Sequence, residues 1–316
     1  MQKNSKIYIA GHNGMVGSAC WRKFKSEGFT NLIGMTSKDL DLRNQKEVYD
    51  FLRNIKPDLI VDAAARVGGI LANDTYPYQF LMDNMLIQNN LIKSAHDLDI
   101  KKFIFLGSSC IYPKEANQPL KEEYLLTGPL EKTNEWYAIA KISGVKLIES
   151  LRQQYSRDYV SLMPTNLYGP HDNFDLKTSH VLPAMIRKFH DAKINNLACV
   201  ELWGSGNPKR EFLHVNDLAK AVLFAAENSL ENHLYNVGSN SDLTIRKLSE
   251  IIQKIVGFNG QIKWNTDKPD GTYRKIMDSS KLNKIGWSSE IELVDGIQMT
   301  YKWYLDNLEK IKYVTI

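Results

Sequence analysis

Cysteine is scarce in this sequence, and the few thiols follow no pattern. The 316 residues contain only three cysteines, Cys20, Cys110 and Cys199. An odd number at irregular spacing argues against a disulfide framework or a zinc site, so we expect no bound metal. Free thiols are typical of a reducing compartment, which favours a cytoplasmic protein.

Long apolar runs and concentrated charge are also lacking. No segment approaches the roughly 20 apolar residues that a membrane-spanning helix needs. The apolar run behind the basic residues 1–6 is too short for a signal peptide. The net charge of +4 is small and dispersed, without a run of Lys or Arg interleaved with aromatic residues. We therefore expect neither a membrane nor a nucleic-acid partner, whereas a small polyanionic ligand would suit this charge.

What the chain does have is an ordinary globular composition and a regular alternation of patterns. It is 43% apolar and 24% charged. Buried strands are predicted at 7–10, 32–35, 59–63, 102–106 and 159–163, separated by helical patterns at 18–27, 45–54, 79–97 and 138–155. This alternation predicts an α/β fold built on a doubly wound parallel sheet with right-handed crossovers.

The pattern changes after Pro164. Loops are expected at 168–179 and 204–210, and helices at 183–192, 216–227 and 245–256. We expect residues 1–165 to form mainly a nucleotide-binding Rossmann domain. Residues 166–316 are expected to form mainly a smaller substrate lobe, with segments that return to the main sheet.

Three glycines follow the first predicted strand. Gly11, Gly14 and Gly17 are spaced G-x-x-G-x-x-G, which differs from the usual G-x-G-x-x-G fingerprint and could be merely a flexible loop. Their place between the first strand and the first helix favours a turn that holds a pyrophosphate at a helix N-terminus. The second strand runs into Thr36, Ser37 and Lys38, and no acidic residue follows it directly. Since Lys38 is available there, NADP(H) is favoured over NAD(H).

A second motif points to carbonyl chemistry. Tyr137 and Lys141 are four residues apart and therefore share one face of a predicted helix, so the ammonium can favour the charged form of the phenol. Ser108 or Ser109, after a predicted strand, could donate to a substrate carbonyl that Tyr137 protonates. Alone, such a pair is most often two helix-surface residues.

Taken together, these motifs resemble the extended short-chain dehydrogenase/reductase family, nearly from end to end. Within it the chain is similar to enzymes that epimerise and reduce a GDP-4-keto-6-deoxy sugar. The matching blocks are IAGHNGMVG (9–17), AAARVGGI (63–70), LGSSCIYP (106–113), YAIAK (137–141), MPTNLYGPHDN (163–173), WGSG (203–206), REFLHV (210–215) and KPDG (268–271).

The resemblance implies a site and a reaction. Ser108, Tyr137 and Lys141 would reduce C4 with NADPH, while Cys110 and His180 would epimerise C3 and C5, giving GDP-L-fucose. The GDP-sugar would be bound by Lys188, Trp203, Arg210 and Asp270. A homodimer is implied as well, through helices near 79–97 and 138–155. The implied NADP contacts are Gly11, Asn13, Gly14, Met15, Val16, Gly17, Ser37, Lys38, Leu106, Gly107, Ser108, Lys141, Pro164, Asn166, Leu167 and His180.

Several positions depart from the family pattern. Asn13, Ser37 and Lys188 stand where similar enzymes often have arginine, and Trp136 stands where they often have proline. The first two departures weaken the expected grip on the ribose 2′-phosphate. Lys188 keeps its charge but loses bidentate phosphate geometry. Trp136, beside the catalytic tyrosine, could reshape the sugar pocket.

Two alternative functions remain. The first is a C4 reductase of a GDP-4-keto-6-deoxy-heptose with little or no epimerase activity, which Trp136 favours. The second is a catalytically silent dinucleotide sensor, which an intact Ser108, Tyr137 and Lys141 argue against. Single residues also have plainer interpretations: Cys110 as a small apolar residue closing a strand, His180 as a satisfied loop residue, Trp203 as core and Arg210 as a solvated charge.

Overall fold

A six-stranded parallel sheet forms the centre of the protein. The computed structural model describes residues 1–268 and 270–311. The strand order is β2-β1-β3-β4-β5-β9, and every neighbouring pair runs parallel. The doubly wound α/β fold predicted from the sequence is confirmed. The strands are β1 (Ile7–Ala10), β2 (Leu32–Ile33), β3 (Leu59–Asp62), β4 (Lys102–Leu106), β5 (Asp158–Pro164) and β9 (Leu234–Val237).

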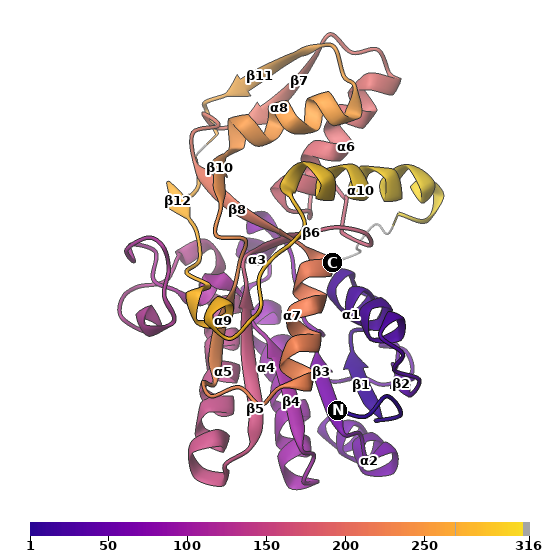
Figure 1. The fold of residues 1–316 in the computed structure, drawn as a ribbon. Coiled ribbons are helices and arrows are strands. Elements are labelled where there is room, and N and C mark those ends of the chain that lie inside the picture. Colours follow the sequence, from indigo (N-terminus) through magenta and orange to yellow (C-terminus); the bar gives the residue numbers. More distant parts are fainter. Residues whose placement is uncertain (269, 312–316) are drawn as a thin grey trace.

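Helices cover both faces of this sheet (Figure 1). On one face lie α1 (Met15–Ser26) and α7 (Val215–Glu227), which share a core with the side chains of Ile7 and Ile9. On the other lie α2 (Gln45–Ile55), α4 (Pro77–Asp97) and α5 (Glu135–Tyr155), around Tyr8 and Ile60. Strands buried on both faces read as continuous apolar runs, which is why the sequence located β1, β3, β4 and β5, whereas β9 was not predicted.

A smaller lobe lies at one end of the main sheet (Figure 1). Its strands β10, β8 and β12 form one sheet, β6 pairs with β8, and β7 pairs in parallel with β11. Together with its helices, these strands enclose a third core around Phe189, Leu248 and Ile297. The strands are β6 (Asn166–Tyr168), β7 (Cys199–Trp203), β8 (Lys209–His214), β10 (Asp242–Thr244), β11 (Gln261–Asn265) and β12 (Arg274–Lys275), and the helices are α6 (Val181–Ile194), α8 (Ile245–Val256) and α10 (Leu293–Asp306).

The structure contains several elements that the sequence did not predict, namely β9 of the main sheet, the strands of the small lobe and the 14-residue helix α10. The second strand ends at Ile33, two residues before the predicted end at 35. The predicted loop at 204–210 runs into β8, which begins at Lys209. The pairings β7 with β11 and β8 with β10 and β12 were not predicted, because each strand is short and its partner is distant in sequence. Two short helices, α3 (Ile70–Thr75) and α9 (Ser280–Lys284), were also missed.

Within the ranges that the structure describes, no helix is long and apolar enough to cross a membrane. The same residues contain no cluster of three or more His, Cys, Asp or Glu side chains that could hold a metal ion.

Candidate active site

The turn after β1 is shaped by two close backbone approaches. Gly11 has φ +74°, and a Cβ on it would lie 2.7 Å from the carbonyl oxygen of Ala63. A Cβ on Gly17, in the first turn of α1, would lie 2.2 Å from the carbonyl oxygen of Gly11. Gly14 is the N-cap residue of α1 and, as a glycine, offers no side chain of its own to cap this end. Larger residues at positions 11 and 17 would therefore push the turn away from the helix N-terminus, where a phosphate is bound in such folds.

A pocket of about 600 Å³ opens beside this turn. Four of the predicted cofactor residues line it, namely Gly11, Asn13, Gly14 and Ser37, whereas Lys38 is exposed and is not among the lining residues. Met15, Val16 and Gly17 lie behind the turn in α1. The lining residues that were not predicted as ligands are His12, Met35, Thr36, Leu40, Asp41, Leu42, Arg43, Ala63, Ala64, Ala65, Arg66, Asp83 and Ile87.

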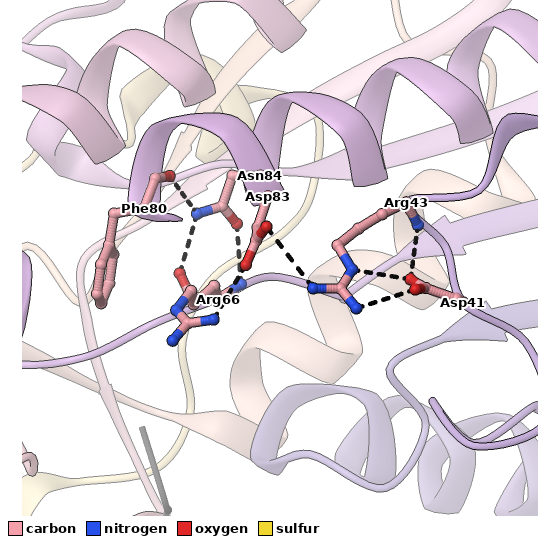
Figure 2. Close-up of polar contacts among 6 residues, drawn as sticks. All are labelled: Asp41, Arg43, Arg66, Phe80, Asp83 and Asn84. Atoms are coloured by element: carbon pink, nitrogen blue, oxygen red, sulfur yellow. Dashed lines mark hydrogen bonds and ion pairs between the residues drawn. The ribbon is translucent and has the colours of Figure 1, made fainter. Parts of the chain in front are cut away.

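Two arginines in this pocket are held by carboxylates (Figure 2). Arg43 donates from Nε and Nη2 to the two carboxylate oxygens of Asp41, each at 2.9 Å, and its Nη1 lies 3.7 Å from Asp83. Arg66 donates to the same Asp83 at 3.0 Å, and its backbone N–H donates to Oδ1 of Asn84 at 2.9 Å. The loop after β2, the loop after β3 and α4 are thereby tied together around the pocket. The sequence signal for Arg43 is only its place after the second strand, and Arg43 was not predicted as a site residue.

The reductase candidates lie between β4 and α5. Ser108 precedes a short 3₁₀ turn, and its hydroxyl accepts from the N–H of Cys110 at 3.4 Å. Lys141 is buried, and its ammonium donates to the carbonyl of Leu106 at 3.0 Å while lying 5.8 Å from the ring centroid of Tyr137. The two helix residues thus face the same strand end, as their spacing predicted.

The electrostatic expectation for Tyr137 needs correction. We expected Lys141 to favour the charged phenolate. Instead, burial raises the pKa of Tyr137, and the nearby groups Cys110 and Asp62 raise it further. The ammonium faces the ring rather than reaching the hydroxyl, so desolvation dominates. The phenol is therefore kept protonated.

Cys110 is buried beside these groups. Burial raises the pKa of its thiol, whereas the ammonium of Lys275 and the hydrogen bond with Ser108 oppose that shift. Lys275, on β12, was not predicted as a site residue, and it comes from a part of the chain 165 positions away. No local sequence signal would have paired it with Cys110.

His180 is the N-cap residue of α6, and its side chain is exposed. Desolvation by surrounding atoms nevertheless lowers the pKa of its imidazole. The residue before it, Ser179, places its carbonyl against Gly69, in the segment that leads into α3. The 175–180 loop therefore contacts the segment that leads into α3, where the N–H of Gly69 donates to the carbonyl of Thr178 at 3.0 Å.

The remaining predicted cofactor residues lie at the carboxyl ends of β4 and β5. Gly107 donates its N–H to Leu162, and Pro164 ends β5. Asn166 and Leu167 belong to β6, where the amide of Asn166 donates to the carbonyl of Glu211 at 2.8 Å. This amide is thus held by the small lobe rather than directed at the pocket.

The predicted substrate residues gather in the small lobe. Trp203 is 63% exposed at the end of β7. The ammonium of Lys188 lies 5.8 Å from its ring centroid, and that of Lys268, which was not predicted as a ligand, lies 5.5 Å away. Asp270 accepts from the backbone N–H and the hydroxyl of Ser205 at 2.9 and 2.6 Å, and these bonds lower the pKa of its carboxyl.

Arg210, on β8, donates to the carbonyl of Thr272 at 2.6 Å, and a Cβ on Gly271 would lie 2.8 Å from its Nη2. Burial lowers the pKa of this guanidinium. Pro269 of the KPDG block lies outside the described residues. An exposed indole next to cations is suited to stacking with a base and pairing with a diphosphate.

Comparison with known proteins identifies the class. A family model described as the NAD dependent epimerase/dehydratase family matches residues 7–238, and the chain belongs to that family. It is 52% identical to GDP-L-fucose synthase 1 of Arabidopsis thaliana, across 97% of this chain and 95% of that protein. It is 49% identical to the GDP-L-fucose synthase of Escherichia coli (strain K12), across 97% of this chain and 98% of that protein.

Among solved structures, a GDP-mannoheptose C4 reductase from Campylobacter jejuni with NADP bound is similar to this chain. Its TM-score is 0.89 at 38% identity, covering 96% of this chain and 99% of that chain. The family resemblance noted in the sequence is confirmed.

Proposed function

We propose that this protein converts a GDP-4-keto-6-deoxy-hexose to GDP-L-fucose, by epimerisation at C3 and C5 and NADPH-dependent reduction at C4. The similarity to GDP-L-fucose synthases over nearly the whole chain supports the substrate and product. The observation that carries the proposal is the grouping of Ser108, Cys110, Tyr137 and Lys141 around the end of β4.

NADP(H) fits the pocket beside the glycine turn. The close approaches at Gly11 and Gly17 leave the N-cap residue of α1, Gly14, in the pocket lining, where a pyrophosphate can bind at the helix N-terminus. The guanidiniums of Arg43 and Arg66 line the same pocket as ion pairs with Asp41 and Asp83, and Asn13 and Ser37 are uncharged. When bound, this cofactor supplies a hydride to C4 of the sugar. The NADP in the heptose reductase structure supports the same choice.

Epimerisation would use the acidity that the C4 ketone gives to C3 and C5. Cys110 would remove a proton as thiolate, and His180 would return one from the opposite face. Because burial raises the pKa of the Cys110 thiol, less of it is present as thiolate, but that thiolate is a stronger base. The ammonium of Lys275 partly opposes this rise in pKa. Ser108 and Tyr137 would donate hydrogen bonds to the enolate oxygen that develops.

Reduction would follow at the same carbonyl. Because burial keeps Tyr137 protonated, it can donate its proton to O4 as the alcohol forms. Ser108 would hold the same oxygen, and Lys141 would orient the cofactor ribose. Lys188, Trp203, Arg210 and Asp270 would hold the GDP moiety in the small lobe, with Lys268 as an additional cation.

A heptose C4 reductase is the second candidate, for a specific reason. Trp136 immediately precedes Tyr137 and is 42% exposed, and a solved relative at 38% identity is a GDP-mannoheptose C4 reductase. The test is to supply hexose and heptose 4-keto substrates in deuterated water with the protein and NADPH. Deuterium at C3 and C5 of a reduced hexose supports the epimerase/reductase. Reduction of the heptose alone, without exchange, supports the second candidate.

A cytoplasmic homodimer belongs to the same proposal. The three free thiols suit a reducing compartment. On α4, Tyr78, Met82 and Leu86 are 66%, 37% and 37% exposed and recur every four residues, so they lie on one face. Ile139 on the adjacent α5 is 37% exposed. Sedimentation of the protein and of a Met82→Glu/Leu86→Glu variant tests this, because the pairing predicts a dimer that the charged variant converts to monomer.

A further inference from the structure

Asp62 is a buried carboxylate that the proposed reaction does not use. It ends β3 and is only 1% exposed. Its Oδ1 accepts from the N–H of Ala64 at 3.2 Å, whereas Oδ2 has no hydrogen-bond partner among the residues the structure describes. A buried carboxylate with an oxygen unpaired is costly unless a positive charge lies nearby.

The sheet register brings this carboxylate close to Lys141. Asp62 pairs with Ala10 of β1 and Phe105 of β4, and all three positions lie on the face covered by α4 and α5. The ammonium of Lys141, from α5, lies 4.7 Å from the ring centroid of Phe105 and 3.0 Å from the carbonyl oxygen of Leu106. Both charged groups are thus buried at neighbouring strand ends on one side of the sheet.

We propose that Asp62 is the buried counter-charge of Lys141 and keeps that side chain protonated during C4 reduction, as a positioning residue that does not touch the substrate. The inference rests on the proposed function. The pKa values agree in direction with this pairing. Burial raises the pKa of Asp62 to about 6 and Lys141 opposes that rise, while burial lowers the pKa of Lys141 and Asp62 opposes that fall.

Other titratable groups face the pair. Tyr8 faces Asp62 from β1, Tyr137 faces it from α5, and Cys110 faces both Lys141 and Tyr137 from the segment after β4. Removing the negative charge of Asp62 would lower the pKa of Lys141 and also that of Tyr137. Since reduction needs both groups protonated, either change moves the alkaline loss of activity to lower pH.

The kinetic test follows hydride transfer from NADPH to the 4-keto sugar in single turnovers, from about pH 6 to about pH 10. In Asp62→Asn, we expect the fall in the hydride-transfer rate at alkaline pH to begin about one pH unit lower, or more, than in wild type. The rate should therefore drop much more at high pH than near neutrality. If the rate falls by the same factor at every pH and the alkaline fall begins where it does in wild type, the proposal is overturned. Asp217→Asn is the matched control, because Asp217 is buried on the opposite face in α7 and does not act on Lys141 or Tyr137.

A stability test needs no substrate and is therefore independent of the proposed function. The melting temperatures of wild type, Asp62→Asn, Lys141→Met and the double variant form a cycle at about pH 8. If the two charges compensate each other, each single variant is destabilised and the double variant loses less than the sum. If Asp62→Asn alone does not fold, folding of the double variant supports the same conclusion. Additive losses of melting temperature, or failure of both Asp62→Asn and the double variant to fold, would overturn the proposal.

Discussion

Arg66 donates to Asp83 at 3.0 Å and so fastens the loop after β3 to α4 (Figure 2). Both side chains are mostly buried, at 30% and 17% exposed. The backbone of that loop, including Ala64 and Ala65, lines the pocket assigned to NADP(H). Ordering this loop before the cofactor arrives lowers the entropy lost on binding.

The first prediction concerns this contact. Asp83→Ala should raise the KM for NADPH about fivefold, corresponding to roughly 1 kcal/mol for a partly buried ion pair, and should leave kcat near wild type. Steady-state kinetics with varied NADPH measure it. Asp50→Ala, which breaks exposed pairs on α2, is the control and should leave KM unchanged. A fall in kcat with KM unchanged would contradict the role assigned to this contact.

Tyr137→Phe should abolish C4 reduction while nucleotide binding is retained. The substitution removes the hydroxyl that donates a proton to O4, and the aromatic contact with Phe80, at 6.4 Å between ring centroids, can persist. NADPH consumption and binding of a GDP-sugar measure the two properties separately. Near wild-type consumption with the 4-keto sugar would refute the assignment.

Cys110→Ser should stop exchange at C3 and C5 and leave hydride transfer. A serine hydroxyl is a far weaker base than a thiolate, whereas Tyr137 and Lys141 are untouched. The product should be an unepimerised, C4-reduced sugar, which NMR of the product identifies. Cys20→Ser, buried in α1 on the other face of the sheet, is the matched thiol control. Continued exchange in Cys110→Ser would show that another group is the base.

Cofactor preference should favour NADPH over NADH, but by a modest margin. Asn13 and Ser37 line the pocket without charge. Ser37→Arg should widen the preference about tenfold, because a guanidinium pairs with a phosphate bidentately. Competitive binding of the two cofactors to both proteins measures the margin. A wild-type preference for NADH would show that the end of the second strand was misinterpreted.

A pH-dependent stability is expected at Asp172. Burial raises the pKa of its carboxyl to about 7, and Oδ2 has no hydrogen-bond partner among the described residues. An unfolded aspartate has a pKa of about 3.9, so the folded protein binds this proton more tightly. Its contribution to stability is therefore full below about pH 4 and declines as pH rises through about 7.

Asp172→Asn should consequently stabilise the protein by about 2 kcal/mol near pH 8 and by almost nothing near pH 4. Urea unfolding at both pH values measures the difference. Asp217→Asn is the contrasting variant and should destabilise at neutral pH, because that carboxylate accepts the N–H of Ile291 at 2.9 Å and pairs with Lys220. If Asp172→Asn raises the free energy of unfolding equally at both pH values, burial of the charge is not the cause of the stabilisation.

The sequence predicted five of the six strands of the main sheet, because most of them are buried on both faces and the helices between them are long, but it missed β9. β1 and β4 agree with their predicted bounds, and α8 does as well. The small lobe was harder, since β12 has two residues and pairs with β8 across more than 60 positions. Propensity and periodicity are local, so they cannot specify such pairings.

Residues of the candidate site were predicted or missed for the same reason. Residues in contiguous motifs, such as Tyr137 and Lys141, were found, because four-residue spacing fixes their common face. Lys275 and Asp62 were missed, since each meets its partner only through the sheet. The direction of the pKa shift at Tyr137 was wrong because spacing says nothing of burial, which decides it.

The position of β9 beside β5 limits where the chain can be truncated or joined to part of a related protein. Its four residues come after the chain has already built β7 and β8 of the small lobe, yet they complete the edge of the main sheet. A fragment ending near residue 165 would expose the backbone of β5, which is a template for aggregation. Exchanging the small lobe for that of a relative would thus require three joints, one near residue 165 and one on either side of the segment that carries α7 and β9.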